Sequence, residues 1–138
     1  MKIMLIGRTG AGKTTLKQRI LNREVKYHKT QMIDYDENII DTPGEYIENK
    51  GYYRALNVVS MDADVIIFIQ SSTDEDTLFP PNFSNMFLGK KIVGVITKGD
   101  LQGNLNRARN FLQNAGVENI IEITPEKKSI EELREILH

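Results

Sequence analysis

The chain contains no cysteine and no tryptophan, only four prolines, and no apolar run long enough to cross a bilayer. The lack of cysteine excludes disulfides, thiolate catalysis and cysteine-ligated zinc sites, and it suits a reducing compartment. The longest strongly apolar run, residues 65–69, has the length of a β-strand. No secretory signal is recognisable, so we expect a cytoplasmic protein that does not enter a membrane.

The chain also has no strong excess of positive or negative charge, because it contains 18 basic and 19 acidic residues and its net charge is −1. A protein whose main partner is nucleic acid or an anionic membrane usually carries a strong basic bias, so we expect neither partner. With 138 residues, 40% of them hydrophobic, the chain can bury one sizeable core. We therefore expect a single domain over residues 1–138.

Short apolar runs alternate with stretches of helical period, which predicts a three-layer α/β fold with a mostly parallel sheet. The expected strands are 2–6, 37–41, 64–70, 91–97 and 119–123, with 30–35 as an antiparallel edge strand. The expected helices are 13–22, 51–61, 104–115 and 129–137, with a short one near 82–88. The last long helix carries a Ser129…Glu132 capping box, and the proline-containing segment 78–83 is expected to be a surface loop.

The segment "GRTGAGKT" at residues 7–14 matches G-x-x-x-x-G-K-[ST], the phosphate-binding P-loop. Its glycines let backbone N–H groups approach phosphate oxygens, Lys13 would contact the β- and γ-phosphates, and Thr14 would bind Mg²⁺. A predicted strand precedes the segment and a predicted helix follows it, as the motif requires. The alternative is a chance glycine-rich turn, which would not need these neighbours. The nucleotide-binding candidates in this region are Gly7, Arg8, Thr9, Gly10, Ala11, Gly12, Lys13, Thr14 and Thr15.

The segment "IIDTPG" at residues 39–44 places Asp41 at the end of a buried strand and Gly44 three residues later. In P-loop NTPases an Asp in this position holds Mg²⁺ through water, and the glycine N–H meets the γ-phosphate. The alternative is an Asp that only caps the turn before Pro43. The position behind a P-loop favours the functional interpretation.

The segment "TKGD" at residues 97–100 follows another buried strand and fits the [NT]KxD pattern of G domains. There the carboxylate of Asp100 would accept two N–H donors from guanine, while Thr97 and the stem of Lys98 would border the base. Adenine lacks that pair of donors, so the motif indicates guanine selection. The alternative is a charged loop at the end of a strand.

Thr30 lies between the first predicted helix and the edge strand, in a segment without apolar periodicity. In a switch segment its hydroxyl would bind Mg²⁺ and its N–H the γ-phosphate, although an exposed Thr at a strand start is the alternative. The candidate metal ligands are thus Thr14, Thr30 and, through water, Asp41. The candidate catalytic residues are Lys13, Thr30, Gly44 and Glu45.

Over nearly its whole length the chain resembles the small GTPase-like proteins of bacterial ethanolamine and propanediol utilisation (EutP/PduV). The resemblance is carried by "MLIGRTGAGKTTL", "YHKTQ", "NIIDTPGEYIENKGYYRAL", "ADVIIFIQ", "FPPNF" and "GVITKGDL". It implies a minimal Ras-like G domain that binds GTP or GDP with Mg²⁺. It also implies a bacterial microcompartment setting, with a shell protein or enzyme as partner and an activating protein.

The sequence departs from the G-domain pattern at two places. Thr124 and Pro125 stand where a Ser-Ala pair usually provides an alanine N–H to the guanine oxygen, and proline has no N–H. Glu45 stands where Ras-like enzymes place a Gln that orients the attacking water. Glu45 is interpreted as a solvated switch residue rather than as a weak catalyst or a base completed by a partner. Arg8 is interpreted as solvated rather than as an arginine finger.

Three functions remain open from the sequence. The first is a Mg²⁺-dependent guanine-nucleotide switch or accessory factor with slow GTP hydrolysis. The second is a P-loop kinase that transfers phosphate from ATP to a short carboxylic acid, which the loss of the N–H at Pro125 keeps open. The third is a structural component of a microcompartment that holds its nucleotide without turnover.

Overall fold

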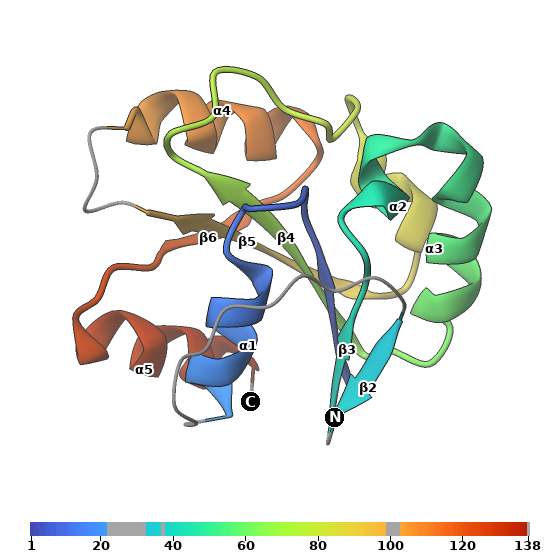
Figure 1. The fold of residues 1–138 in the computed structure, drawn as a ribbon, viewed down its shortest axis with the longest axis horizontal. Coiled ribbons are helices and arrows are strands. Elements are labelled where there is room, and N and C mark those ends of the chain that lie inside the picture. The colour runs from blue at the N-terminus through green and yellow to red at the C-terminus, as the bar shows by residue number, and fades with distance from the viewer. Residues whose placement is uncertain (22–32, 37, 99–102, 138) are drawn as a thin grey trace.

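The computed structural model describes residues 1–21, 33–36, 38–98 and 103–137 (Figure 1). The predicted site residues Thr30 and Asp100 lie outside these ranges. None of the described helices has both the length and the apolar character needed to cross a membrane.

A six-stranded sheet with the order β2-β3-β1-β4-β5-β6 forms the centre of the fold. Neighbouring strands from β3 to β6 run parallel, while β2 pairs antiparallel with β3, Tyr35 lying opposite Ile40. The predicted mostly parallel sheet with one antiparallel edge strand is therefore confirmed. The strands are β1 Ile3–Ile6, β2 Asp34–Asp36, β3 Ile39–Asp41, β4 Val65–Ser71, β5 Lys91–Thr97 and β6 Asn119–Glu122.

Helices cover both faces of this sheet, as the three-layer prediction requires (Figure 1). In the described structure α1 and α5 lie together on one face, and α2, α3 and α4 lie on the other. The helices are α1 Lys13–Ile20, α2 Glu45–Glu48, α3 Tyr53–Ser60, α4 Leu105–Asn114 and α5 Lys127–Leu137, with 3₁₀ helices η1 Lys50–Tyr52 and η2 Phe83–Phe87.

Alternating side chains of the buried strands build two separate cores. Met4 and Ile6 of β1 face the α3 and α4 side, whereas Ile3 and Leu5 face α1 and α5. Strands buried on both faces read as continuous apolar runs because each successive side chain enters one core or the other. This arrangement brings the carboxyl ends of β1, β3 and β5 to one edge of the sheet.

Both helices predicted in the middle of the chain are present. The predicted helix 51–61 corresponds to η1 and α3 and is preceded by the short helix α2, and the predicted short helix near 82–88 is the 3₁₀ helix η2. Residues 78–82 of the predicted loop run outside the regular elements and Phe83 begins η2, but Phe79 and Phe83 are buried and pack with Phe68. Proline prevents a strand or helix in this loop, yet the core still recruits its aromatic side chains.

The predicted capping box at Ser129 is wrong. Helix α5 begins two residues earlier, at Lys127, so Ser129 lies within its first turn. The Ser129 hydroxyl instead donates to the carbonyls of Thr124 and Glu126 and accepts from the Thr124 N–H, at 2.9–3.1 Å. A hydroxyl can hydrogen-bond several backbone groups of a tight loop. Here the Ser129 hydroxyl bonds the loop after β6 instead of capping the helix.

Candidate functional site

The P-loop, residues 7–14, connects β1 to α1 in a shape that depends on glycine. Gly10 has φ of 83° and Gly12 has φ of 101°, in the left-handed region that other residues rarely adopt. Gly12 is also the N-cap residue of α1, so the positive end of the helix faces the loop. Gly7 is buried against Ile69 of β4. The segment thus has the backbone that a phosphate cradle requires.

Lys13 places a desolvated ammonium group at this loop. The residue is 7% exposed, and its Nζ donates to the Arg8 carbonyl over 3.3 Å. Burial lowers the pKa of Lys13 from its ordinary value, and the charges of Asp41 and Glu48 act in the opposite direction. Phosphate oxygens would replace the lost hydration of the ammonium, so an anionic ligand is favoured here.

Thr14 and Asp41 provide the oxygen atoms expected for Mg²⁺. Thr14, in the first turn of α1, is 6% exposed, and Asp41, the last residue of β3, is 1% exposed. A hydroxyl and a carboxylate are hard donors that suit Mg²⁺, which usually completes its shell with water and phosphate oxygens. The described residues contain no group of three or more His, Cys, Asp or Glu that could hold a metal. A hydroxyl and a carboxylate from two separate elements fit a cation whose other ligands are water and phosphate oxygens.

Gly44 lies directly against the P-loop. A Cβ atom built on Gly44 would approach the backbone N and the Oγ1 of Thr9 to 2.3 Å, which no real side chain could do. Next to this contact, the Thr9 hydroxyl donates to Glu48 Oε2 over 2.9 Å. Helix α2 is thus held against the loop at its N-cap, Gly44, and at its last residue, Glu48, while its first residue, Glu45, is exposed.

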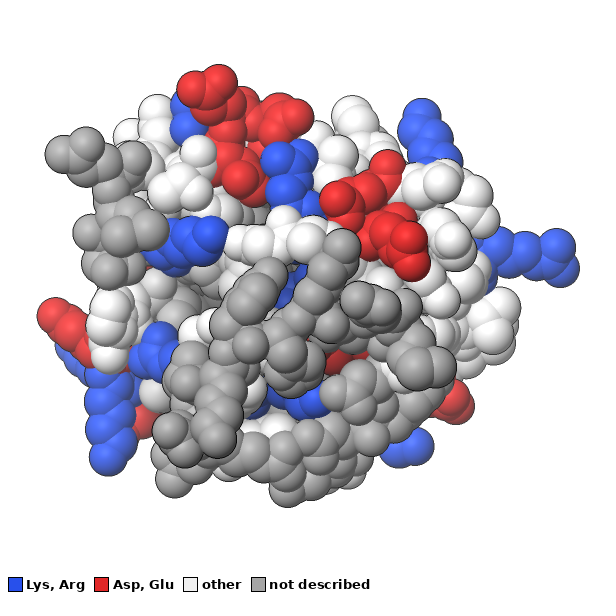
Figure 2. Space-filling view, in the orientation of Figure 1, with Lys and Arg blue, Asp and Glu red and all other residues white. Residues whose placement is uncertain are grey.

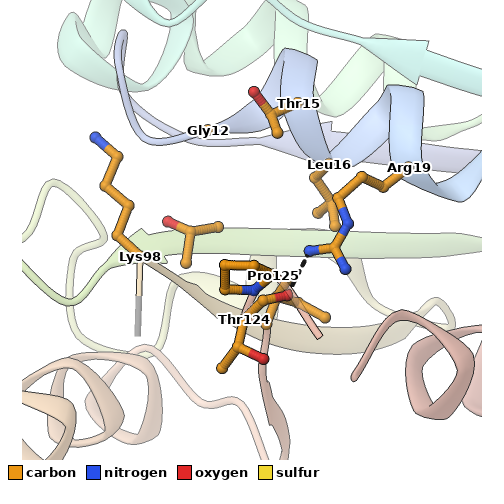
Figure 3. A pocket seen from close by; sticks show the side chains of 9 residues that line it. Gly12, Thr15, Leu16, Arg19, Lys98, Thr124 and Pro125 are labelled. Carbon is orange, nitrogen blue, oxygen red and sulfur yellow. Dashed lines mark hydrogen bonds between the residues drawn. The ribbon is translucent and has the colours of Figure 1, made fainter. Parts of the chain in front are cut away.

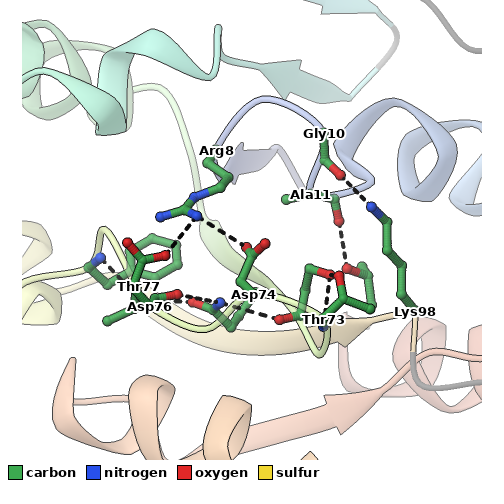
Figure 4. A network of polar contacts seen from close by, with 12 residues as sticks. Arg8, Gly10, Ala11, Thr73, Asp74, Asp76, Thr77 and Lys98 are labelled. Atoms are coloured by element: carbon green, nitrogen blue, oxygen red, sulfur yellow. Dashed lines mark hydrogen bonds and ion pairs between the residues drawn. The ribbon is translucent and has the colours of Figure 1, made fainter. Parts of the chain in front are cut away.

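The end of β5 contacts the P-loop from the other side. Thr97 Oγ1 donates to the Ala11 carbonyl over 2.5 Å, and Lys98 Nζ donates to the Gly10 carbonyl over 2.7 Å (Figure 4). Lys98 has φ of 58°, and its own carbonyl accepts from the hydroxyl of Ser72. The described part of the TKGD motif therefore lies against the described part of the P-loop, as the motif order predicts.

The expectation that Arg8 is solvated is wrong. Its Nη1 lies 2.9 Å from Asp76 Oδ1 and 3.7 Å from Asp74 Oδ2, in the loop that follows β4 (Figure 4). These carboxylates draw the guanidinium toward the β4 loop. Figure 2 shows acidic and basic side chains interspersed over the described part of one face.

A pocket of about 400 Å³ lies beside the P-loop (Figure 3). Ligand pockets of this size accommodate a nucleobase with its ribose. Three segments that are distant in the sequence form its walls: the P-loop with α1, the end of β5, and the loop after β6. The lining residues are Gly12, Thr15, Leu16, Arg19, Thr97, Lys98, Ile123, Thr124 and Pro125.

Sequence reasoning missed four residues that the structure brings to this region: Arg19, Glu48, Asp74 and Asp76. The acidic run that includes Asp74 and Asp76 follows a buried strand, a position that often borders a site in α/β folds. No local sequence pattern marks Glu48 or Arg19, because each side chain contacts a loop that is distant in the sequence.

Comparisons with known proteins agree with the motifs. The family model described as "PduV-EutP: Ethanolamine utilisation - propanediol utilisation" matches residues 1–138. The chain is 34% identical over 121 residues to "Propanediol utilization protein PduV" of Citrobacter freundii, covering 86% of this chain and 80% of that protein. It is 31% identical over 119 residues to "Probable acetate kinase EutP" of Escherichia coli (strain K12), covering 85% and 75%.

Among solved structures, "Crystal structure of Aquifex aeolicus Era Y63A bound to GDP.AlF4-" matches with a TM-score of 0.64 and 21% identity. The match covers 99% of this chain but 56% of that chain, so this chain spans little more than half its length. At this identity the likeness supports the fold alone. The predicted P-loop NTPase fold is confirmed.

We expect Gly44→Ala to destabilise the nucleotide-free protein by about 1–3 kcal/mol, the usual cost of inserting an atom into a tight contact. The reason is the Thr9 backbone, which cannot move without displacing the P-loop. Urea unfolding measures the free energy of unfolding. Gly51→Ala is the matched control, because a Cβ there meets only the flexible Asn49 side chain, at 3.2 Å from its Oδ1. Equal stability of the two variants would contradict the Gly44 contact.

Proposed function

The chain belongs to the PduV-EutP family of ethanolamine- and propanediol-utilisation proteins, and on that premise we propose that it is a Mg²⁺-dependent guanine-nucleotide-binding protein. It would form a single G domain over residues 1–138, hydrolyse GTP slowly, and act as a switch or accessory factor in that catabolism. The observation that carries the proposal is the convergence of three motifs at one edge of the sheet. The P-loop follows β1, Asp41 is the last residue of β3 and Thr97 is the last residue of β5, and these strands run parallel in one sheet. Gly12 and Thr97 also line the pocket.

The phosphates would lie over the P-loop, at the positive end of α1. Loop amides would donate to their oxygens, and Lys13 would exchange its 3.3 Å contact with the Arg8 carbonyl for the β- and γ-phosphates. The base would enter the pocket beside Lys98 and Thr124. Asp100, from the sequence motif, would accept the N–H donors of guanine.

Mg²⁺ would be held by the Thr14 hydroxyl and, through water, by Asp41, with Thr30 as a third candidate from the sequence. When bound, the cation neutralises charge on the phosphate oxygens. Asp41 and Glu48 already lie close enough to Lys13 to act on its pKa. The chain therefore brings its own acidic and basic groups together where a phosphate-bound cation would lie.

Hydrolysis would be slow for two reasons. Glu45 is an exposed carboxylate in the position where a neutral Gln would orient water, so it adds negative charge next to a polyanion. Arg8, the arginine within the P-loop, is held by Asp74 and Asp76. The expected rate is that of an intrinsic Ras-like GTPase, about 10⁻⁴ to 10⁻³ s⁻¹.

Switching would depend on the contacts between the P-loop and α2. A γ-phosphate would attract the Gly44 N–H but would also place negative charge near Glu48, whose carboxylate binds Thr9 and acts on Lys13. A diphosphate would leave the Thr9–Glu48 hydrogen bond undisturbed. The two nucleotide states would thus differ in the position of α2, which a partner could recognise.

A kinase is the second candidate, because a relative is named "Probable acetate kinase EutP" and Pro125 removes one guanine-specific N–H. Such an enzyme would transfer the γ-phosphoryl group of ATP to a short carboxylate. A pocket next to the γ-phosphate would then be needed for the acceptor. The pocket described above lies where either candidate would place its purine, so the reaction products distinguish the two candidates.

We expect GDP and GTP to bind more tightly than ATP in calorimetric titrations of the purified protein with Mg²⁺. Lys13→Ala should lose the triphosphate, because phosphate binding depends on that ammonium. Lys50→Ala is the control, since this exposed lysine in η1 lies outside the site. The absence of any purine nucleotide binding would contradict the proposed function.

We expect Glu48→Gln to improve binding of a non-hydrolysable GTP analogue relative to GDP by about three- to tenfold, through loss of one partly exposed negative charge. The amide oxygen can still accept from Thr9, so the hydrogen bond is retained. The measurement is the ratio of the two dissociation constants. Glu75→Gln, at an exposed acidic position of the β4 loop, should leave the ratio unchanged. An unchanged ratio in Glu48→Gln would exclude the switch contact.

We expect GTP to yield GDP and orthophosphate, and ATP with acetate to yield no acetyl phosphate. Labelled γ-phosphate follows the product, and hydroxylamine traps any acyl phosphate as a hydroxamate. Formation of acetohydroxamate that depends on ATP, and on Lys13, would establish the kinase instead.

A further inference from the structure

In the loop after β6, residues 123–126, every backbone N–H group is already hydrogen-bonded within the protein. The Ile123 N–H donates to the Ile96 carbonyl over 2.8 Å, the Thr124 N–H to Ser129 Oγ over 3.1 Å, and the Glu126 N–H to Thr124 Oγ1 over 3.3 Å. Pro125 has no N–H. This described loop lines the base side of the pocket, yet its backbone has no N–H left for a ligand.

A side chain from α1 reaches the same place. Arg19 lines the pocket, and its Nη1 and Nη2 donate to the carbonyls of Thr124 (2.6 Å) and Glu126 (3.2 Å). Figure 3 shows the guanidinium extending from α1 toward Thr124 and Pro125. A guanidinium has five N–H donors in one plane, so two carbonyl bonds leave further donors at the pocket wall.

The backbone of Arg19 is itself fixed. Arg134 of α5 donates from Nη2 to the carbonyls of Arg19 (2.6 Å) and Ile20 (3.1 Å). Lys98, the other cation that lines the pocket, is bound to the Gly10 carbonyl. Arg19 is therefore the cation held against the loop where the backbone donor is missing.

We propose that Arg19 is a specificity-determining residue that donates to the oxygen at position 6 of the purine. This proposal rests on the proposed function, since it concerns the same nucleotide pocket. A guanidinium can only donate, so it attracts a 6-oxo group and opposes the 6-amino group of adenine. The pocket would thus select 6-oxopurines although the loop has lost its own donor.

The test compares GDP with 6-thioguanosine 5′-diphosphate, which keeps the N1–H and 2-amino groups but has sulfur, a weaker acceptor, at position 6. Calorimetry of the full chain with Mg²⁺ gives both dissociation constants. The wild type should prefer GDP by about tenfold or more, as a charge-assisted hydrogen bond implies. Arg19→Leu should weaken GDP binding by a similar factor and reduce the preference to nearly one.

Two further variants separate recognition from support of the loop. Arg19→Lys keeps a cationic donor and should retain most of the preference. Arg134 donates hydrogen bonds to α1 but does not line the pocket. Arg134→Leu should therefore weaken the binding of both nucleotides equally.

If Arg19→Leu weakened the binding of both nucleotides equally, the proposal would be overturned, because Arg19 would then only support the loop. A preference that disappears in Thr124→Val but persists in Arg19→Leu would also overturn it, by assigning the donor to the Thr124 hydroxyl. Failure of the wild type to bind either nucleotide would instead reject the proposed function itself.

Discussion

Hydrogen bonds from β5 to the carbonyls of the P-loop fix the peptide planes on which the rest of the site depends. Thr97 binds the Ala11 carbonyl from 86 residues away in the chain, and Lys98 binds the Gly10 carbonyl. A trans peptide points its N–H opposite to its C=O, so fixing the carbonyls also orients the amides. The shape of the cradle is therefore a property of the whole sheet edge and not of the glycine-rich segment alone.

The charges around the loop are arranged so that a phosphate would complete them. The ammonium of Lys13 is desolvated, which lowers its pKa, while Asp41 and Glu48 partly compensate for the burial. Arg8 is drawn to the acidic loop after β4. Positive charge at the cradle thus comes from Lys13, from Lys98 at the Gly10 carbonyl and from the end of α1, while the carboxylate of Glu48 acts on Lys13.

In the pocket beside the P-loop, a side chain from α1 reaches a loop whose backbone N–H groups are already hydrogen-bonded. Ser129 holds the Thr124 N–H, and Pro125 contributes none. Arg19 reaches across from α1 to the same loop. A relative is named as a probable acetate kinase, and the solved structure that shares the fold is titled as Era bound to GDP.AlF4-, so the fold by itself does not decide the function.

The sequence by itself determined the layered fold, the parallel sheet with its antiparallel edge, and the order of the phosphate and strand-end motifs. Continuous apolar runs and a motif of fixed spacing are local signals, and β5 was predicted at the residues it occupies, Lys91–Thr97. The tertiary structure alone decided the ion pairs of Arg8, the contact of Glu48 with Thr9, the burial of Phe79 and Phe83, and the place of Ser129 in the loop after β6. These features depend on which distant group lies within reach of a side chain, and residue spacing along the chain carries no information about that.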